Sequence, residues 1–307
     1  MLSPARKLVP TLALAASLLA MATPSASAAN SQDHYVALGD SYAAGALIPG
    51  QSAGLCLRSD HNYGHLVAAA RGVSAYTDVT CSAAKIKDIT GAQSEAGATI
   101  NDPQINAVNA DTTLITLGIG GNDLGTSSLG IAEVIVTCVG GSVVNPGGTP
   151  CKDVYEHGHW VWSWDTLSWT WQYGTDDLKA RIAGAAPALA ATLQQIHAKA
   201  PNAKVLLVGY PSVLPADGAR CAGRQPVTPG DVTYLHGILD QLNGMLATTA
   251  AANNAAFVDT ETPTRGHDAC SDDPWIEGLL PTSPAAPFHP NATGEQAMAN
   301  AVLGTLN

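Results

Sequence analysis

Residues 112–117 read Thr-Thr-Leu-Ile-Thr-Leu, a β-branched and nearly continuous apolar run. Such a run is typical of a strand in a parallel sheet that is covered by helices on both faces. Four other short stretches are predicted to be strands of the same sheet, at 34–38, 75–80, 204–208 and 256–258.

Helical patterns separate or follow these strands. Residues 177–200 carry apolar side chains at helical spacing and end before Pro201, and 229–252 and 293–306 show similar patterns. Alternating strands and helices predict an α/β fold in which helices cover both faces of a parallel sheet. Because the chain shows no internal repeat and no linker-like change of composition, we expect one domain.

The composition describes a globular chain that is poor in charge. Of 307 residues, 46% are hydrophobic and 13% are charged, and the formal net charge is −11. These values argue against a disordered protein. The chain has 14 Lys and Arg against 25 Asp and Glu, with no basic run, which argues against nucleic acid as a partner.

The sequence of the first 28 residues predicts that they form a secretory signal peptide. Arg6 and Lys7 precede an apolar stretch at 8–22, and residues 26–28, Ala-Ser-Ala, form a small-x-small cleavage site. An uncleaved membrane anchor is less favoured, because the apolar stretch is shorter than the ~20 residues that a spanning helix needs. We therefore expect residues 29–307 to form the exported domain.

The chain contains six cysteines, which in an exported protein predict three disulfides. No C-x-x-C pair is present, so zinc binding by thiolates and thiol redox chemistry have little support. Six cysteines allow about 15 pairings. We prefer the sequential one, which closes local loops: Cys56 with Cys81, Cys138 with Cys151, and Cys221 with Cys270.

Polar residues follow three of the predicted strands. These are Asp40-Ser41, residues 81–83 (Cys-Ser-Ala) and residues 120–123 (Gly-Gly-Asn-Asp). Ligands of parallel sheets bind beyond the carboxyl ends of the strands, so chemistry is expected there. A serine at a strand-to-helix turn can act as a nucleophile when a histidine removes its proton and nearby N–H groups stabilise the oxyanion. Alternatively, Ser41 is an ordinary helix cap.

Residues 36–45, Val-Ala-Leu-Gly-Asp-Ser-Tyr-Ala-Ala-Gly, resemble the first block of the GDSL, or SGNH, hydrolase family. Residues 120–123 match its G-x-N-D block, and residues 288–291, Phe-His-Pro-Asn, match its histidine block. The resemblance is closest to secreted actinobacterial, Streptomyces-type lipases and esterases. It implies a three-layer α/β/α flavodoxin-like domain with a central five-stranded parallel sheet in the order 2-1-3-4-5.

The resemblance also implies roles for single residues. Ser41 would be the nucleophile, and His289 would be the general base and later the general acid. The backbone N–H of Ser41 and the side-chain amide of Asn122 would donate to the oxyanion. The third donor in the family is a glycine N–H, and this chain has Ala83 there, which serves only if the backbone accommodates a Cβ.

A second departure concerns the group that orients His289. Many family members have an aspartate three residues before the histidine, where this chain has Ala286. Some secreted relatives use a backbone carbonyl, so we predict a Ser–His dyad supported by the carbonyl of Ala286 or Pro287. The alternative is a carboxylate from Asp272 or Asp273. Asp40 is expected to shape the turn.

Five of the six tryptophans lie between Trp160 and Trp171, in a Trp-rich insertion at about 155–175. Two alternating runs predict a β-hairpin with its rings on one face, namely Trp160, Trp162, Trp164, Trp169, Trp171 and Tyr173. The hairpin either covers a patch of core or contacts a lipid interface, flanks an acyl groove or binds sugar rings.

The sequence thus predicts a secreted, monomeric serine hydrolase that cleaves lipid or other acyl esters with Ser41 and His289 and needs no metal or organic cofactor. Alternatives are a phospholipase A-type enzyme, a carbohydrate acetyl esterase, or a catalytically lapsed surface-binding protein that uses the Trp hairpin. The helical histidines His197 and His236 are expected to be ordinary packed or exposed residues.

Overall fold

The computed structural model describes residues 33–157, 159–163, 168–172 and 174–307. At its centre lies a five-stranded sheet in the order β2-β1-β5-β8-β9, in which every pairing is parallel. The strands are β1 (His34–Gly39), β2 (Ala75–Asp78), β5 (Leu114–Gly118), β8 (Lys204–Val208) and β9 (Ala256–Val258). Numbered among themselves, they follow the order 2-1-3-4-5, which confirms the predicted flavodoxin-like sheet.

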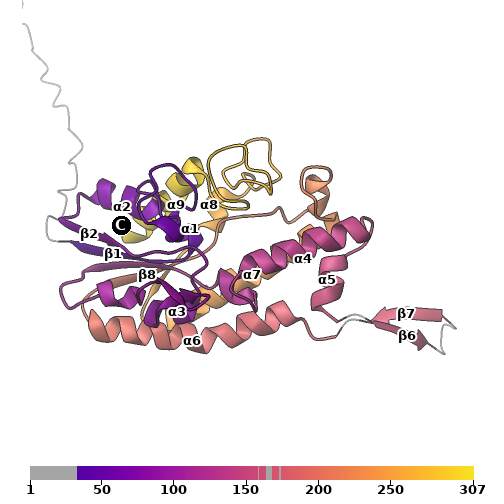
Figure 1. Cartoon of the computed structure of the whole chain (residues 1–307), viewed down its shortest axis with the longest axis horizontal. Coiled ribbons are helices and arrows are strands. Elements are labelled where there is room, and N and C mark those ends of the chain that lie inside the picture. Colours follow the sequence, from indigo (N-terminus) through magenta and orange to yellow (C-terminus); the bar gives the residue numbers. More distant parts are fainter. Residues whose placement is uncertain (1–32, 158, 164–167, 173) are drawn as a thin grey trace, which may run out of the picture.

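Helices cover both faces of this sheet, as the sequence predicted (Figure 1). One face carries α2 (Tyr63–Arg71) and α9 (Ala292–Leu306), and the other carries α3 (Ile86–Thr90), α6 (Asp177–Lys199) and α7 (Pro229–Ala252). The bounds of α7 equal the predicted range, and those of α6 and α9 differ from it by one residue.

The apolar side chains of the strands pack into two separate hydrophobic cores, one on each face of the sheet. In β1, Val36 and Leu38 belong to the core under α3, α6 and α7, whereas Tyr35 and Ala37 belong to the core under α2 and α9. Successive side chains of a strand point to opposite faces, so a strand that is covered on both sides must be apolar throughout. This requirement explains why β1 and β5 lack the alternation of a half-exposed strand.

The remaining elements lie in the connections, mostly at the carboxyl edge of the sheet. The helices are α1 (Ser41–Ala44), α4 (Ile131–Val144), α5 (Pro150–Tyr155) and α8 (Glu261–Thr264), with short 3-10 turns η1 (Gly54–Cys56), η2 (Gln104–Ala107), η3 (Gly121–Leu124) and η4 (Gly218–Cys221). A small antiparallel pair, β3 (Gln93–Glu95) and β4 (Ala98–Asn101), also lies in these connections. Within the described ranges, no helix combines the length and apolarity needed to cross a bilayer.

Three disulfides brace these connections, and their pairing is the sequential one that we preferred. Cys56 pairs with Cys81, Cys138 with Cys151, and Cys221 with Cys270. The first links η1 to the loop after β2, and the second ties α4 to α5.

The tryptophan-rich segment forms an antiparallel hairpin of β6 (His159–Ser163) and β7 (Ser168–Gln172). Trp160 lies opposite Trp171, and Trp162 opposite Trp169, so these four rings share one face. Figure 1 shows the hairpin extending away from the sheet beyond α5. Trp160 and Trp169 are 60% and 61% exposed, which argues against the expectation that the hairpin covers a patch of core. Trp164, Tyr173 and the predicted signal peptide lie outside the described residues.

Candidate active site

Ser41 lies where β1 passes into α1, at the carboxyl edge of the sheet. Asp40 caps α1, since its Oδ1 accepts the N–H of Tyr42 at 3.0 Å. A Cβ on Gly39 would lie 2.4 Å from the carbonyl oxygen of Gly118, so only glycine fits where β1 approaches β5. Ser41 is the first residue of α1, and its N–H therefore has no acceptor within the helix.

His289 contacts the Ser41 side chain directly. Its Nε2 lies 2.7 Å from Oγ of Ser41, and its Nδ1 lies 2.7 Å from the carbonyl oxygen of Pro287. A carbonyl oxygen can only accept, so Nδ1 carries the proton and Nε2 accepts from the serine hydroxyl. Burial lowers the pKa of His289 to about 4, opposed by the hydrogen bond to Pro287. The imidazole is therefore neutral near pH 7, the state that a general base requires.

Of the two predicted carbonyls, the one that contacts the imidazole belongs to Pro287. The carbonyl of Ala286 instead accepts the backbone N–H of His289 at 3.1 Å. The alternative aspartates are engaged elsewhere: Asp272 accepts from Arg224 at 2.7 Å, and Asp273 lies beside His267. The described residues thus place a backbone carbonyl, and no carboxylate, at Nδ1 of His289.

Tyr42 joins the turn at Ser41 to the loop that carries His289, a role that the sequence analysis missed. Its ring stacks on the His289 imidazole with centroids 4.4 Å apart, and its hydroxyl donates to the carbonyl oxygen of Phe288 at 2.6 Å. Phe288 has a φ of 58°, a left-handed conformation that costs a non-glycine residue about 1–2 kcal/mol. The contacts of Tyr42 therefore help to hold a strained residue next to His289.

Ala83 has a φ of 63°, so the loop after β2 keeps the left-handed backbone that glycine adopts freely. The N–H groups on either side, from Ser82 and Ala84, donate to the carbonyl oxygens of Cys56 and Cys81 at 3.0 and 3.2 Å. Among the described residues, none accepts the N–H of Ala83. The alanine thus retains the backbone donor at the position of the family's glycine.

Asn122 lies buried in η3, and its side chain is held at both ends. Its Nδ2 donates to the carbonyl oxygen of Ala84 at 3.1 Å, and its Oδ1 accepts the N–H of Ile131 at 3.2 Å. The amide nitrogen has two hydrogens, so one remains for another acceptor. Asn122 lines the same pocket as Ser41 and His289.

Tyr210 connects the turn that contains Asp40 and Ser41 to the 3-10 turn η3, which contains Gly121 and Asn122. Its hydroxyl donates to Oδ2 of Asp40 and accepts the N–H of Gly121 at 2.7 Å. Burial raises the pKa of Asp40 to about 7, and the hydrogen bond from Tyr210 opposes that rise. Asp40 thus shapes the turn, as expected. Tyr210 follows β8 by two residues, so a search for polar residues at strand ends would have found it.

An apolar pocket of about 120 Å³ opens beside Ser41 and His289. Its walls come mainly from α4 and α7, including Ile131, Val134, Ile135, Leu235, Leu239 and Leu242. Walls of this kind bind hydrocarbon, with the few polar groups at one end fixing the orientation of the ligand.

This chain matches the model of the GDSL-like lipase/acylhydrolase family over residues 146–297. It is 40% identical over 278 residues to Lipase 2 of Streptomyces coelicolor, and the match covers 89% of this chain and 85% of that protein. The structure is similar to that of phospholipase A1 from Streptomyces albidoflavus NA297, with a TM-score of 0.68 and 30% identity over 90% of this chain and 98% of that one. It is also similar to an extracellular lipase from Streptomyces rimosus, with a TM-score of 0.66 and 26% identity over 90% of this chain and 100% of that one.

The chain belongs to the GDSL-like lipase/acylhydrolase family, as the three sequence blocks predicted. It is an ester hydrolase of the lipase and esterase type.

Proposed function

We propose that the protein is a secreted serine hydrolase that cleaves fatty-acyl esters through an acyl-enzyme on Ser41. The observation that carries this proposal is the 2.7 Å contact between Oγ of Ser41 and Nε2 of His289 at the end of an apolar pocket. Residues 29–307 would form one hydrolase domain after removal of the signal peptide at 1–28.

In the first half of the reaction, Nε2 of His289 takes the hydroxyl proton while Oγ of Ser41 attacks the ester carbonyl carbon. The carbonyl oxygen becomes an oxyanion, to which three donors are assigned: the backbone N–H groups of Ser41 and Ala83 and Nδ2 of Asn122. The intermediate collapses as the imidazolium gives its proton to the leaving alcohol. The acyl group stays on Oγ.

The second half repeats these steps with water. His289 takes a proton from the water, the resulting hydroxide attacks the acyl carbonyl carbon, and the same donors stabilise the oxyanion. Collapse breaks the bond to Oγ of Ser41, which regains a proton from the imidazolium, and releases the carboxylic acid. The carbonyl of Pro287 keeps the proton on Nδ1 and the ring in place throughout.

The pocket favours a lipid substrate over an acetylated sugar. Its walls are aliphatic side chains of α4 and α7, which gain by burying a hydrocarbon chain and offer little to an acetyl group. A phospholipase A1-type activity is the second candidate, because a structural relative at 30% identity is described as a phospholipase A1.

Secretion is supported by the predicted signal peptide and by three disulfides, which persist in oxidising surroundings. We further propose that the monomeric enzyme contacts a lipid–water interface through the Trp160–Tyr173 hairpin. The exposed rings of Trp160 and Trp169 support this role, because indole rings favour the boundary between hydrocarbon and water.

An acyl-length profile tests this function. We expect kcat/KM for nitrophenyl esters to rise from the acetyl to longer chains, and Ile135→Trp, which fills the pocket, to depress only the long-chain rates. Phosphatidylcholine with a labelled acyl chain would separate phospholipase from general lipase activity. Fastest turnover of the acetyl ester, with no effect of Ile135→Trp, would contradict the fatty-acyl assignment and favour an acetyl esterase.

A further inference from the structure

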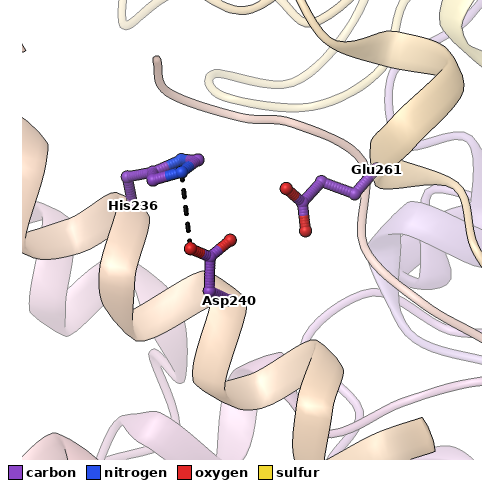
Figure 2. A group of neighbouring side chains, drawn as sticks. All are labelled: His236, Asp240 and Glu261. Carbon is purple, nitrogen blue, oxygen red and sulfur yellow. Dashed lines mark ion pairs between the residues drawn. The ribbon is translucent and has the colours of Figure 1, made fainter. Parts of the chain in front are cut away.

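Three side chains outside the reaction described above meet between α7 and α8 (Figure 2). His236 and Asp240 lie one turn apart on α7, and Glu261 is the first residue of α8. One nitrogen or oxygen from each side chain lies within 4.8 Å of the other two, and Nε2 of His236 is 3.5 Å from Oδ2 of Asp240.

The His236 ring is oriented as histidine ligands of metals are. Its Nδ1 lies 3.0 Å from the carbonyl oxygen of Leu214, which can only accept, so Nδ1 carries the proton. The lone pair of Nε2 is thereby left on the side of Asp240. Histidines that bind metals nearly always donate their other ring N–H to a carbonyl or carboxylate in this way.

The two carboxylates offer one buried and one accessible ligand. Glu261 is 7% exposed and is fixed by Nδ2 of Asn243 and by the Arg265 guanidinium, each at 3.1 Å. The Asp240 side chain is 51% exposed. Figure 2 shows both carboxyl groups and the imidazole turned toward a common space.

From this arrangement, we propose that His236, Asp240 and Glu261 bind a divalent transition-metal ion, with Zn²⁺ as the preferred ion and water in the fourth position. A tetrahedral zinc site with bonds of ~2.0–2.1 Å holds its ligand atoms roughly 3.4 Å apart, close to the observed separation of His236 and Asp240. One imidazole with two carboxylates suits zinc better than calcium or magnesium, which prefer oxygen ligands alone.

Bound metal would join α7 to α8 and stabilise the fold. His236 also lines the apolar pocket, so the ion would fix the position of one pocket wall without touching Ser41. The role is therefore structural, separate from the Ser41–His289 reaction and independent of whether that reaction is assigned correctly. The sequence analysis treated His236 as an ordinary helical residue, because the approach of Glu261 depends on the folding of α8 beside α7.

Metal titration of the chelator-treated, purified protein tests the proposal. Calorimetry with ZnCl₂ should give one saturable site, and Co²⁺ should bind to the same site with visible absorption bands of a four-coordinate ion. His236→Gln and Asp240→Asn should each weaken binding by at least about tenfold, and a given zinc concentration should raise the melting temperature of the wild type more than that of either variant. Asp240→Asn alters a half-exposed side chain, so its fold, checked by circular dichroism, should remain intact.

His267→Gln is the matched control. Nδ1 of His267 lies 3.3 Å from the Asp273 carboxylate, but no third ligand completes a cluster there among the described residues. This variant should bind zinc as the wild type does. Absence of saturable binding in the wild type, or unchanged affinity in His236→Gln and Asp240→Asn, would overturn the proposal and leave the three side chains as an ion-pair network.

Discussion

The carbonyl oxygen of Pro287 lies 2.7 Å from Nδ1 of His289, where a Ser–His–Asp triad would have a carboxylate. A neutral acceptor fixes the tautomer of the ring as a carboxylate does, but it adds no negative charge to stabilise the imidazolium. Burial can therefore depress the pKa of His289 without the opposing pull of an anion.

This relationship predicts the pH dependence of hydrolysis. The base is active when neutral, so kcat/KM should stay high as the pH falls through the ordinary histidine range and decline only near the lowered pKa of about 4. Initial rates on a soluble short-chain ester, measured across the acidic pH range, check this decline. The prediction fails if activity halves at or above the unperturbed value of about 6.5 while the fold remains intact.

Tyr42→Phe keeps the ring stacked on His289 but removes the hydroxyl that donates to Phe288. We expect kcat to fall about tenfold with KM unchanged, because a small displacement of a catalytic group is costly even when binding is preserved. Tyr234→Phe, which removes a hydrogen bond to Asp176 from another tyrosine, is the control and should keep the wild-type kcat. A lower melting temperature with unchanged kcat would show that Tyr42 only stabilises the fold.

Ala83→Gly tests the strained backbone of the loop after β2, in which the N–H of Ala83 is proposed to bind the oxyanion. Ala83 has a φ of 63°, which glycine adopts without the penalty of a Cβ, so the substitution should raise the free energy of unfolding by up to about 1 kcal/mol. The backbone N–H is retained, and kcat should not fall. Thermal and denaturant unfolding measure the first effect and ester hydrolysis the second. A loss of stability would mean that the loop relaxes to another conformation.

We expect the tryptophan hairpin to promote binding to lipid aggregates such as vesicles and to have no effect on the hydrolysis of soluble esters. Replacing Trp160 and Trp169 by serine removes two exposed rings, each of which gains when it is buried among lipids. Binding to phosphatidylcholine vesicles in a flotation assay should become at least about tenfold weaker, whereas rates on soluble esters should not change. Leu55→Ser, at another exposed apolar residue, should leave both unchanged. Equal vesicle binding by the tryptophan variant would exclude the proposed contact.

The sequence predicted the central sheet well, because doubly covered strands such as β1 and β5 must be apolar along their whole length. It did not predict β3 and β4, whose sequences, Gln-Ser-Glu and Ala-Thr-Ile-Asn, are only three and four residues long and bury only Gln93. Likewise, α4 reads Ile-Ala-Glu-Val-Ile-Val-Thr, with too many β-branched residues to favour a helix by propensity.

The candidate site was predictable where a motif lies on one continuous segment, as for Ser41, Asn122 and His289. It was not predictable where the position depends on folding. An alanine in the sequence does not indicate the left-handed backbone that Ala83 adopts in the structure. The choice between the carbonyls of Ala286 and Pro287 depends on the path of the loop. Tyr210 reaches Asp40 only because β8 and β1 flank β5 in the sheet.

The central claim is that Ser41 is the residue that becomes acylated. Peptide mapping by mass spectrometry, after labelling with a serine-directed phosphonate or a rapid quench during ester turnover, tests it most directly. We predict one adduct per chain on the peptide that contains Ser41, abolished by Ser41→Ala, strongly slowed by His289→Gln and unaffected by the surface control Ser128→Ala. An adduct on a different residue, or full ester hydrolysis by Ser41→Ala, would contradict the account.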